Sequence, residues 1–455
     1  MSGDRPPRAA KRSPSARRGA DARRRATRAS GTRPAPAPEG SLRAGQLGAL
    51  SDALNAVLPL AEPADSALHQ FFRRHPKMGQ RDRAFVAEGV FAVLRRLRSL
   101  SALAQDAAPR RLAIAAALRE MGLSLREVEP ALSAEERNWA TELRGRKPVL
   151  SEAEKAELPD WLWERLGAAY APEERDQLAR AWLTPAPLDL RVNPMKTRRQ
   201  DAQAALALAG IEALPTPYSP LGLRIAGRPA LQQLAQFKSG EIEVQDDGSQ
   251  LLGFLVSPRR TDMVVDFCAG AGGKTLLLGA LMRSQGRVYA FDVSPARLAK
   301  LKPRLARSGL SNVQPVLIQN ERDTHVKRLA GKIDRVLVDA PCSGLGTLRR
   351  NPDLKWRQRA EGIGELAAKQ ARILASAATL LKPGGRLVYA TCSVLPEENE
   401  AIIDAFLRAH PQFVLASAAA ELARAHIPLD TGELLKLYPH RHGCDGFFAA
   451  ILERQ

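Results

Sequence analysis

The sequence predicts an α/β protein whose C-terminal half is a mostly parallel, doubly wound sheet. From about residue 237 onward, short apolar runs typical of buried parallel strands alternate with helical segments. The expected strands are 263–267, 288–293, 313–318, 333–338 and 387–391, and a final run at 447–452 is expected to form an antiparallel edge strand. The expected helices are 274–282, 295–307, 363–381 and 397–409.

Two regions precede this sheet and differ from it in pattern. Residues 41–150 have helical periodicity, with Leu47, Leu50 and Leu54 on one apolar helix face. A second apolar face runs through residues 85–97, on a helix that also carries several arginines. In a chain this basic, those arginines favour contact with RNA over simple solvation.

Residues 151–236 are expected to form a small α+β module. Its strands are expected at 188–192 and 223–225, where apolar residues alternate with polar ones. Arg191 and Asn193 lie on the opposite strand face from the apolar residues. That face either contacts a phosphate backbone or belongs to a structural adaptor between domains.

The charge of the chain predicts an anionic partner. The net charge is +19 and the pI is about 10.3, values that favour nucleic acid. Residues 1–40 carry 11 Lys/Arg and 3 Asp/Glu, so the rest of the chain still carries +11. This segment is expected to be a disordered basic tail that touches RNA, with a transit peptide as the alternative. No apolar run is long enough to span a membrane, and no secretory signal is visible.

The cysteine pattern indicates free thiols. The chain has four cysteines, and they are Cys268, Cys342, Cys392 and Cys444. None forms a Cys-x-x-Cys pair and no histidine cluster accompanies them, which argues against a metal site and a disulfide framework. A reducing, cytoplasmic interior is expected. Cys444 has no partner in sequence and is expected to be a packing residue.

A glycine-rich turn at 266–275 follows the first expected strand. A phosphate-binding loop needs a glycine where Cys268 stands, and the dinucleotide pattern needs one where Thr275 stands. Asp292 ends the next strand, 20 residues after Gly272, where a carboxylate can accept hydrogen bonds from both ribose hydroxyls. A nucleoside ligand without a phosphate fits this pattern, and S-adenosylmethionine is the leading case.

Two cysteines are expected to meet at the carboxyl edge of the sheet. Asp339 and Cys342 follow the fourth expected strand and Cys392 ends the fifth, and adjacent strands bring their ends together. A thiolate that adds to C6 of a pyrimidine makes C5 able to take a methyl group from a sulfonium. The helix expected from Glu397 onward favours the thiolate through its N-terminus, whereas its glutamates oppose it.

A basic loop with an aromatic residue, 349–356, follows Cys342. This composition suits a single-stranded nucleic acid whose base is turned out and stacked on Trp356. The alternative is that Trp356 is a packing residue.

Three motifs, at 266–275, 339–344 and 389–400, resemble the donor-binding, Pro-Cys and Thr-Cys motifs of the Sun/Nol/Nop family of RNA cytosine-C5 methyltransferases. Within that family, the bacterial enzymes that modify small-subunit ribosomal RNA are the most similar. The resemblance covers residues 180–455 and extends to the helical region, where Met78–Ala84 matches a NusB-like RNA-binding domain. It implies a Rossmann-like methyltransferase domain preceded by an RRM- or ferredoxin-like module.

The resemblance also implies residue roles. Cys392 matches the nucleophile, Cys342 matches the cysteine that resolves the covalent adduct, and Asp339 would bind the cytosine edge or the donor. The residues that would hold the donor are Cys268, Ala269, Gly270, Ala271, Gly272, Gly273, Lys274, Asp292 and Asn320. Ala271 stands where the family usually has proline, and Asp323 is the alternative to Asn320 as the adenine contact.

The sequence therefore predicts S-adenosylmethionine-dependent methylation of C5 of a cytosine in RNA, with small-subunit ribosomal RNA as the substrate. The predicted enzyme is a cytoplasmic monomer without a metal. The alternatives are the same chemistry on tRNA and a non-catalytic RNA-binding assembly factor. The predicted domains are a tail (1–40), a helical NusB-like domain (41–150), the α+β module (151–236) and the catalytic domain (237–455).

Overall fold

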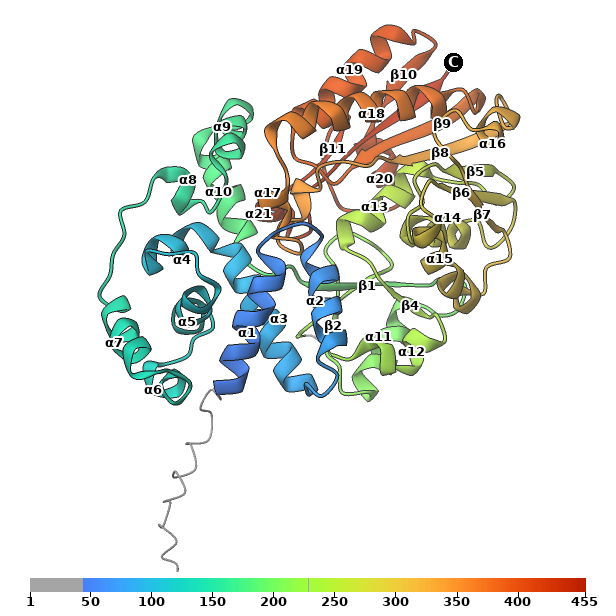
Figure 1. Ribbon diagram of the computed structural model, residues 1–455. Helices are drawn as coiled ribbons and strands as arrows, with labels where there is room; N and C mark the ends of the chain where they lie inside the picture. Colours follow the sequence, from blue (N-terminus) through green and yellow to red (C-terminus); the bar gives the residue numbers. More distant parts are fainter. Residues whose placement is uncertain (1–43, 228) are drawn as a thin grey trace, which may run out of the picture. The chain divides into compact units, whose positions relative to one another are not determined.

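The computed structural model describes residues 44–227 and 229–455, and its first helices pack around one apolar core (Figure 1). These helices are α1 (Ala44–Val57), α2 (Ala64–Arg74), α3 (Gln80–Arg95), α4 (Leu97–Ala104), α5 (Pro109–Arg119), α6 (Leu125–Val128) and α7 (Ala134–Leu143). Leu47, Leu50, Leu54, Val86 and Val90 are completely buried in their shared core, as the helical periodicity predicts. The predicted basic tail, 1–40, lies outside the described residues.

A small antiparallel sheet follows, in the order β2-β3-β1-β4. Its strands are β1 (Leu188–Val192), β2 (Ala213–Pro215), β3 (Gly222–Ile225) and β4 (Ile242–Val244). The helices of this part of the chain are α8 (Glu152–Lys155), α9 (Asp160–Ala169), α10 (Pro172–Trp182), α11 (Arg199–Leu208) and α12 (Ala235–Lys238). The α+β character is as predicted, although β4 lies just beyond the boundary placed at residue 236.

The phosphate-contacting strand face predicted on β1 is wrong. Arg191 and Asn193 are 3% and 6% exposed. The Arg191 guanidinium donates to the carbonyl of Gly273 at 2.5 Å, and Asn193 Nδ2 donates to that of Ser308 at 3.0 Å. Burial lowers the pKa of Arg191 to about 10. The polar face of β1 packs against the C-terminal half of the chain, which agrees with the adaptor alternative for this strand face.

The C-terminal half is an eight-stranded sheet in the order β10-β12-β9-β8-β5-β6-β7, with β11 paired to β12. The strands are β5 (Met263–Asp266), β6 (Arg287–Asp292), β7 (Val313–Leu317), β8 (Ile333–Asp339), β9 (Leu381–Thr391), β10 (Phe413–Ala416), β11 (Leu435–Leu437) and β12 (Phe447–Arg454). Strands β5 to β9 pair in parallel. The strand order reverses at β5, so the ends of β5 and β8 flank the crevice where such sheets bind ligands.

The final strand is not at the edge, in contrast to the prediction. β12 pairs antiparallel with β9 on one side and with β10 on the other. β10 is the edge strand, and its apolar run of four residues, Phe413–Ala416, is too short to distinguish a strand from a buried helix segment by sequence. The sheet is still mostly parallel with an antiparallel edge.

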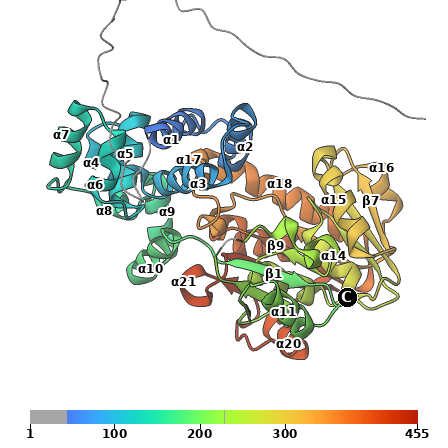
Figure 2. The same ribbon diagram turned by 90° about the horizontal axis from the view of Figure 1, so that it is seen from below.

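Helices cover both faces of the sheet (Figures 1 and 2). On one face lie α18 (Ala360–Ala378) and α19 (Glu400–Ala409); on the other lie α13 (Asp247–Val256), α14 (Gly273–Leu281) and α20 (Ala418–Arg424). Neighbouring residues of β8 pack into the cores on opposite faces of the sheet: Val336 and Val338 on the α18 side, and Leu337 on the α13 side. The remaining helices are α15 (Pro295–Ser308), α16 (Thr324–Arg328), α17 (Leu354–Arg357) and α21 (Pro439–His442).

Two predicted helix boundaries need correction. α18 ends at Ala378, because Leu381 already begins β9. The helix expected over 397–409 begins instead with a 3₁₀ turn, Pro396–Glu398, and the α-helix starts at Glu400.

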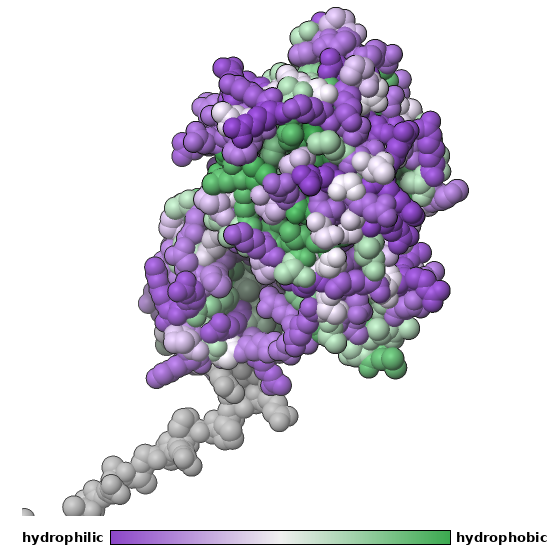
Figure 3. Space-filling view, turned by 90° about the vertical axis from the view of Figure 1, so that its right-hand side faces the viewer, coloured by the Kyte–Doolittle hydropathy of each residue, from purple (hydrophilic) through white to green (hydrophobic). Residues whose placement is uncertain are grey.

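One face of the molecule is mostly polar at its surface. Figure 3 shows a face covered largely by hydrophilic residues, with hydrophobic residues gathered in one recessed band. Within residues 44–227 and 229–455, every helix is too short or too polar to cross a bilayer.

Candidate active site

Cys342 and Cys392 face each other at the carboxyl edge of the sheet. β8 and β9 are parallel neighbours with Asp339 opposite Ala390, so the residues that follow both strands emerge side by side. The two Sγ atoms are 3.4 Å apart. The prediction that these strand ends bring the thiols together is confirmed.

The two thiols are not equivalent. Three effects raise the pKa of Cys342 well above its usual value: its hydrogen bond with Cys392, burial, and the nearby charge of Glu398. Cys342 is therefore protonated at neutral pH, and its S–H can donate to the Cys392 sulfur. A hydrogen bond accepted by a sulfur favours the anionic form of that sulfur. The geometry thus places a neutral S–H group 3.4 Å from the Cys392 sulfur.

Lys274, the first lysine of α14, brings a positive charge to this edge. Its ammonium donates to Asp339 Oδ2 at 2.6 Å. Burial lowers the pKa of Lys274, but Asp339, Cys392 and Asp266 together outweigh burial and raise it. The ammonium is therefore charged at neutral pH, and it brings a positive charge to the sheet edge where Cys392 lies.

Glu398 joins the two cysteine motifs, a role that the sequence did not reveal. It is completely buried. Its Oε1 accepts from the backbone N–H of Ser343 at 2.8 Å, and its Oε2 accepts from the hydroxyls of Ser343 and Ser393, each at 2.5 Å. One carboxylate thus holds the residues that directly follow Cys342 and Cys392. The repeated Cys-Ser pair was the available signal in the sequence.

The other two glutamates of this segment are neutralised by partners. Glu397 lies 3.3 Å from Arg165, and Glu400 lies 2.6 Å from Lys436. The three glutamates that were expected to oppose a thiolate therefore each have a compensating donor or cation.

Replacing Glu398 with alanine is expected to destabilise the protein by on the order of 3 kcal/mol or more, because its buried donors lose a charged acceptor. Glu397→Ala is the matched control; its carboxylate is 43% exposed, so its ion pair contributes about 1 kcal/mol at most. Chemical denaturation of both variants measures the difference. Equal stability of the two would contradict the bridging role of Glu398.

Gly346 holds the backbone of Cys392. Its N–H donates to the carbonyl of Cys392 at 2.8 Å, and its own carbonyl accepts from the N–H of Gly446 at 2.8 Å. A Cβ at residue 346 would lie 2.2 Å from the carbonyl oxygen of Gly446, so only glycine fits. The nucleophile candidate is therefore fixed at its main chain as well as at its sulfur.

The glycine turn after β5 requires its glycines. Gly270 and Gly272 have φ angles of +56° and +82°, and a Cβ on Gly272 would lie 2.1 Å from the Leu301 side chain. A Cβ on Gly270 would meet nothing within 4 Å, so the turn is open at that point. The carbonyl of Ala271 accepts from Arg304 at 2.7 Å, which restrains the position where the family usually has proline.

The residues at this turn fit a cationic, ribose-bearing donor. Within the described part of the chain, Asp266 Oδ1 is buried without a hydrogen-bond partner, while its Oδ2 accepts from Thr275 at 2.7 Å. Asp292 accepts from the N–H groups of Gly270 and Ser294, at 2.8 and 2.7 Å, one on each oxygen. These bonds fix the Asp292 carboxylate and leave each oxygen a second lone pair for a hydroxyl donor.

Asp266 makes the stability of the protein depend on pH. Burial raises its pKa to about 7, with Thr275 opposing the shift and Asp339 adding to it. A carboxyl with a raised pKa holds its proton more tightly in the folded than in the unfolded chain. Its stabilising contribution is therefore complete below its ordinary pKa of 3.8 and is lost as the pH rises through about 7.

Asp266→Asn should flatten this dependence, because asparagine stays neutral. The contribution of Asp266 to the free energy of unfolding should fall by on the order of 3 kcal/mol between pH 4 and pH 8. Denaturation at a series of pH values measures it, with the exposed Asp404→Asn as control. Parallel pH profiles for the wild type and Asp266→Asn would contradict the assignment.

The two candidate adenine contacts follow β7. Asp323 begins α16, and its carboxylate accepts from the N–H groups of Gln319 and His325, both at 2.8 Å. These backbone bonds hold the pKa of Asp323 well below its usual range. Asn320 is exposed, and its Oδ1 accepts from the N–H of Arg322 at 2.8 Å. Asp323 thus shapes the loop, which leaves Asn320 as the more accessible side chain.

The remaining sequence candidates are structural. Trp356 packs against the core of the N-terminal helices and its indole N–H donates to the carbonyl of Leu94 at 2.7 Å, so the packing alternative is correct. Cys444 is completely buried, as predicted. Burial, followed by Asp266, raises the pKa of Cys268 well above its usual value, so this thiol is neutral. Within residues 44–227 and 229–455, no cluster of metal-ligating side chains is found.

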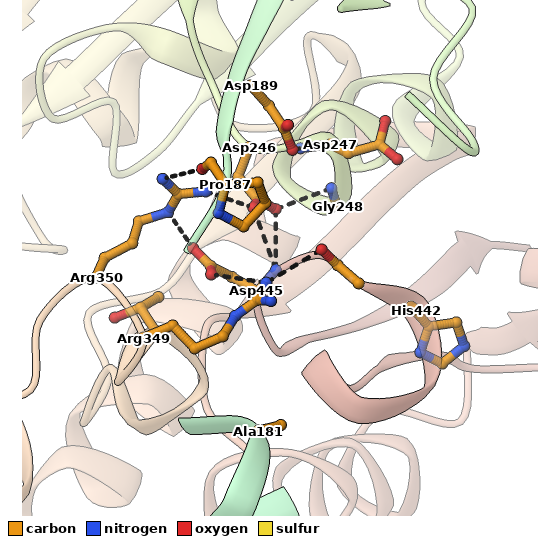
Figure 4. A network of polar contacts seen from close by, with 12 residues as sticks. Ala181, Pro187, Asp189, Asp246, Asp247, Gly248, Arg349, Arg350, His442 and Asp445 are labelled. Atoms are coloured by element: carbon orange, nitrogen blue, oxygen red, sulfur yellow. Dashed lines mark hydrogen bonds and ion pairs between the residues drawn. The ribbon is translucent and has the colours of Figure 1, made fainter. Parts of the chain in front are cut away.

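A buried ionic network holds the loop that follows Cys342 (Figure 4). Arg350 lies 2.5 Å from Asp445 and 2.8 Å from Asp246, and Arg349 lies 3.4 Å from Asp445. Burial, together with Asp246, raises the pKa of Asp445 to about 6, against the opposing effect of the arginines. The network ties the loop to the start of α13 and to the segment before β12.

Comparisons with known proteins agree with this geometry. Residues 253–453 match the family described as 16S rRNA methyltransferase RsmB/F, and residues 158–232 match the ferredoxin-like domain of RsmF/B-like methyltransferases. A Synechocystis sp. protein named "Probable ribosomal RNA small subunit methyltransferase B" is 37% identical over 306 residues, which are 67% of this chain and 68% of that protein. The ribosomal RNA small subunit methyltransferase B of Sodalis glossinidius is 35% identical over 316 residues, 69% of this chain and 70% of that one. The crystal structure of PH0851 has a TM-score of 0.75 at 28% identity and covers 91% of this chain and 99% of that chain.

Proposed function

We propose cytosine-C5 methylation of RNA for this chain, which belongs to the RsmB/F family of methyltransferases. The observation that carries the proposal is the cysteine pair, in which a protonated Cys342 lies 3.4 Å from the Cys392 sulfur. A methyltransferase acting on a nucleophilic oxygen or nitrogen needs no thiolate. C5 of a pyrimidine is a poor nucleophile and becomes reactive only when a thiolate adds to C6.

The proposed reaction uses both Cys392 and Cys342. The Cys392 thiolate forms a bond to C6, and the electron pair of the C5–C6 double bond moves towards C5 and the ring carbonyl. C5 would then take a methyl group from a bound sulfonium donor, and the electron pair of the broken S–CH₃ bond would stay on the donor sulfur. The C5 proton passes to solvent, the electron pair of the C5–H bond re-forms the C5–C6 double bond, and the Cys392 thiolate departs. Cys342, at the same edge, serves this release.

The donor is S-adenosylmethionine, which supplies an electrophilic methyl group on a sulfonium. The proposed donor site is Cys268–Lys274, with Asp292 on the ribose and Asn320 beside the adenine. Asp266 Oδ1, buried and without a partner among the described residues, would interact with the positive charge of the donor, and that charge favours the ionised over the protonated form of this carboxyl. Asp339, held by Lys274 at 2.6 Å, would contact the cytosine edge or the donor.

The proposed substrate is small-subunit ribosomal RNA. Two observations support it: the names of the curated relatives, and a net charge of +19 that suits a polyanion. The proposed location is therefore the cytoplasm. The helical region and the ferredoxin-like module, proposed as 41–150 and 151–236, would help to bind the RNA. Transfer RNA is the alternative substrate, and a non-catalytic assembly factor is the alternative function.

Bisulfite sequencing of total RNA from cells with and without this protein tests the proposal. We expect one or a few cytosines of the small-subunit ribosomal RNA to be protected only when the protein is present. Protection found only in tRNA would show that tRNA, and not ribosomal RNA, is the substrate. If no cytosine changed in any RNA, the C5 chemistry would be wrong.

A further inference from the structure

Residues 343–358 form a closed loop that starts directly after Cys342. Gln358 Nε2 donates to the carbonyl of Ser343 at 2.8 Å, which ties the two ends of the loop together. Compact loops of roughly this length whose ends meet are frequently functional. The base of this loop belongs to the cysteine site, since Glu398 binds Ser343 and Gly346 binds the carbonyl of Cys392.

The far side of the loop caps the C-terminal end of α3. The last four carbonyls of a helix have no partner within the helix. In α3 the first two of these, from Ala92 and Val93, accept from the N–H of Arg96. The last two accept from the loop: Trp356 Nε1 donates to Leu94 at 2.7 Å, and Lys355 Nζ donates to Arg95 at 2.9 Å.

The same loop caps the N-terminal end of α2. Asp353 Oδ2 accepts from the N–H of Ala64, the first residue of α2, at 3.2 Å. Pro63, at the capping position, makes no side-chain cap of its own. The loop therefore places a carboxylate at a helix N-terminus and an ammonium at a helix C-terminus, the arrangement that both helix dipoles favour.

These contacts are buried. Asp353 and Lys355 are 3% and 2% exposed, and the Trp356 ring packs against the core of the N-terminal helices. A buried ammonium is costly unless it is paired. The charge of Glu157, which is itself bound to the N–H of Arg98 at the start of α4, opposes the effect of burial on Lys355. On balance burial lowers the pKa of Lys355 to about 7, so its amine keeps part of its charge at neutral pH. The docking of the loop on α2 and α3 is thus polar and buried.

We propose that Asp353, Lys355 and Trp356 are positioning residues that make the N-terminal helices part of the apparatus holding Cys342. The loop has one end on the cysteine pair and the other on α2 and α3, so a loosened docking lets Cys342 move relative to Cys392. The consequence for release of the adduct rests on the proposed function. The expected change in the reactivity of the Cys342 thiol does not rest on the proposed function.

Trp356→Phe tests the link, since it keeps a ring and removes only the N–H that reaches Leu94. Trp139→Phe is the matched control: Trp139 packs against the same helical core, and its indole N–H has no partner in the described part of the chain. We expect iodoacetamide to alkylate Cys342 roughly 2- to 10-fold faster in Trp356→Phe than in Trp139→Phe, the equivalent of one neutral hydrogen bond. Mass spectrometry of the Cys342 peptide measures this in the full-length protein.

A second pair of variants provides a rescue. Asp353→Ala removes the cap on α2, whereas Asp353→Asn keeps an acceptor oxygen there. We expect faster Cys342 alkylation and a lower kcat, with an unchanged KM for RNA, in Asp353→Ala, and near wild-type values in Asp353→Asn. If Trp356→Phe and Asp353→Ala lower only the melting temperature, and Cys342 reacts as in the controls, the positioning role is overturned. If alkylation changes as expected but the wild type methylates no cytosine, the proposed function fails and the positioning role stands.

Discussion

Replacing Cys392 with alanine is expected to abolish methyl transfer while RNA binding survives. The alanine variant has no sulfur to add to C6, so C5 stays unreactive, and a loss of at least about 10³-fold in kcat is expected. Transfer of labelled methyl groups to RNA gives the rate. Anisotropy of a fluorescent RNA, measured at several salt concentrations, gives the binding.

Cys444→Ala is the control for loss of a cysteine, because Cys444 is completely buried in a hydrophobic core. It should retain activity at temperatures below its melting point. Turnover near the wild-type rate in Cys392→Ala would remove the nucleophile assignment. Loss of RNA binding in the same variant would indicate a folding defect, which circular dichroism would detect.

Replacing Cys342 with alanine is expected to trap the protein on its RNA. Cys392 can still add to C6 and C5 can still be methylated, but release of the adduct loses the thiol that lies 3.4 Å from Cys392. A covalent complex should therefore accumulate, visible as a retarded band on a denaturing gel. Most of the RNA-bound protein should be in this band under single-turnover conditions.

The double variant Cys342→Ala/Cys392→Ala separates the two roles. It should give no retarded band, because the covalent bond needs the Cys392 sulfur. A band that persists in the double variant would place the adduct on another residue. Multiple turnovers without a band in Cys342→Ala would show that Cys342 is not needed for release.

The strands could be predicted because parallel strands buried on both faces need uninterrupted apolar runs. The runs at 263–267 and 333–338 became β5 and β8, and with them the ends that carry Asp266 and Asp339. β10 was missed because its apolar run is only four residues long, and so short a run does not distinguish a strand from a buried helix segment. The wrong prediction that β12 is an edge strand followed from missing β10, since an edge strand pairs with a neighbour on one side only.

The polar face of β1 shows a different limit of prediction from the sequence. Alternation in sequence separates the two faces of a strand, and it placed Arg191 and Asn193 together. It cannot tell a polar face in water from one buried against another part of the chain. Trp356 is the same case, because a tryptophan beside basic residues suits a base or a helix end equally well.

By itself, the sequence determined the parallel sheet, the glycine turn that matches neither phosphate-binding pattern, and the two cysteines at neighbouring strand ends. These features depend on residue type and on spacing along the chain, which sequence records directly. Only the tertiary structure decided which thiol stays protonated, that Glu398 joins both cysteine motifs, and that the loop after Cys342 caps α2 and α3. Each of these depends on burial and on a partner that is distant in sequence: 50 residues separate the two cysteines, and 262 separate Trp356 from Leu94.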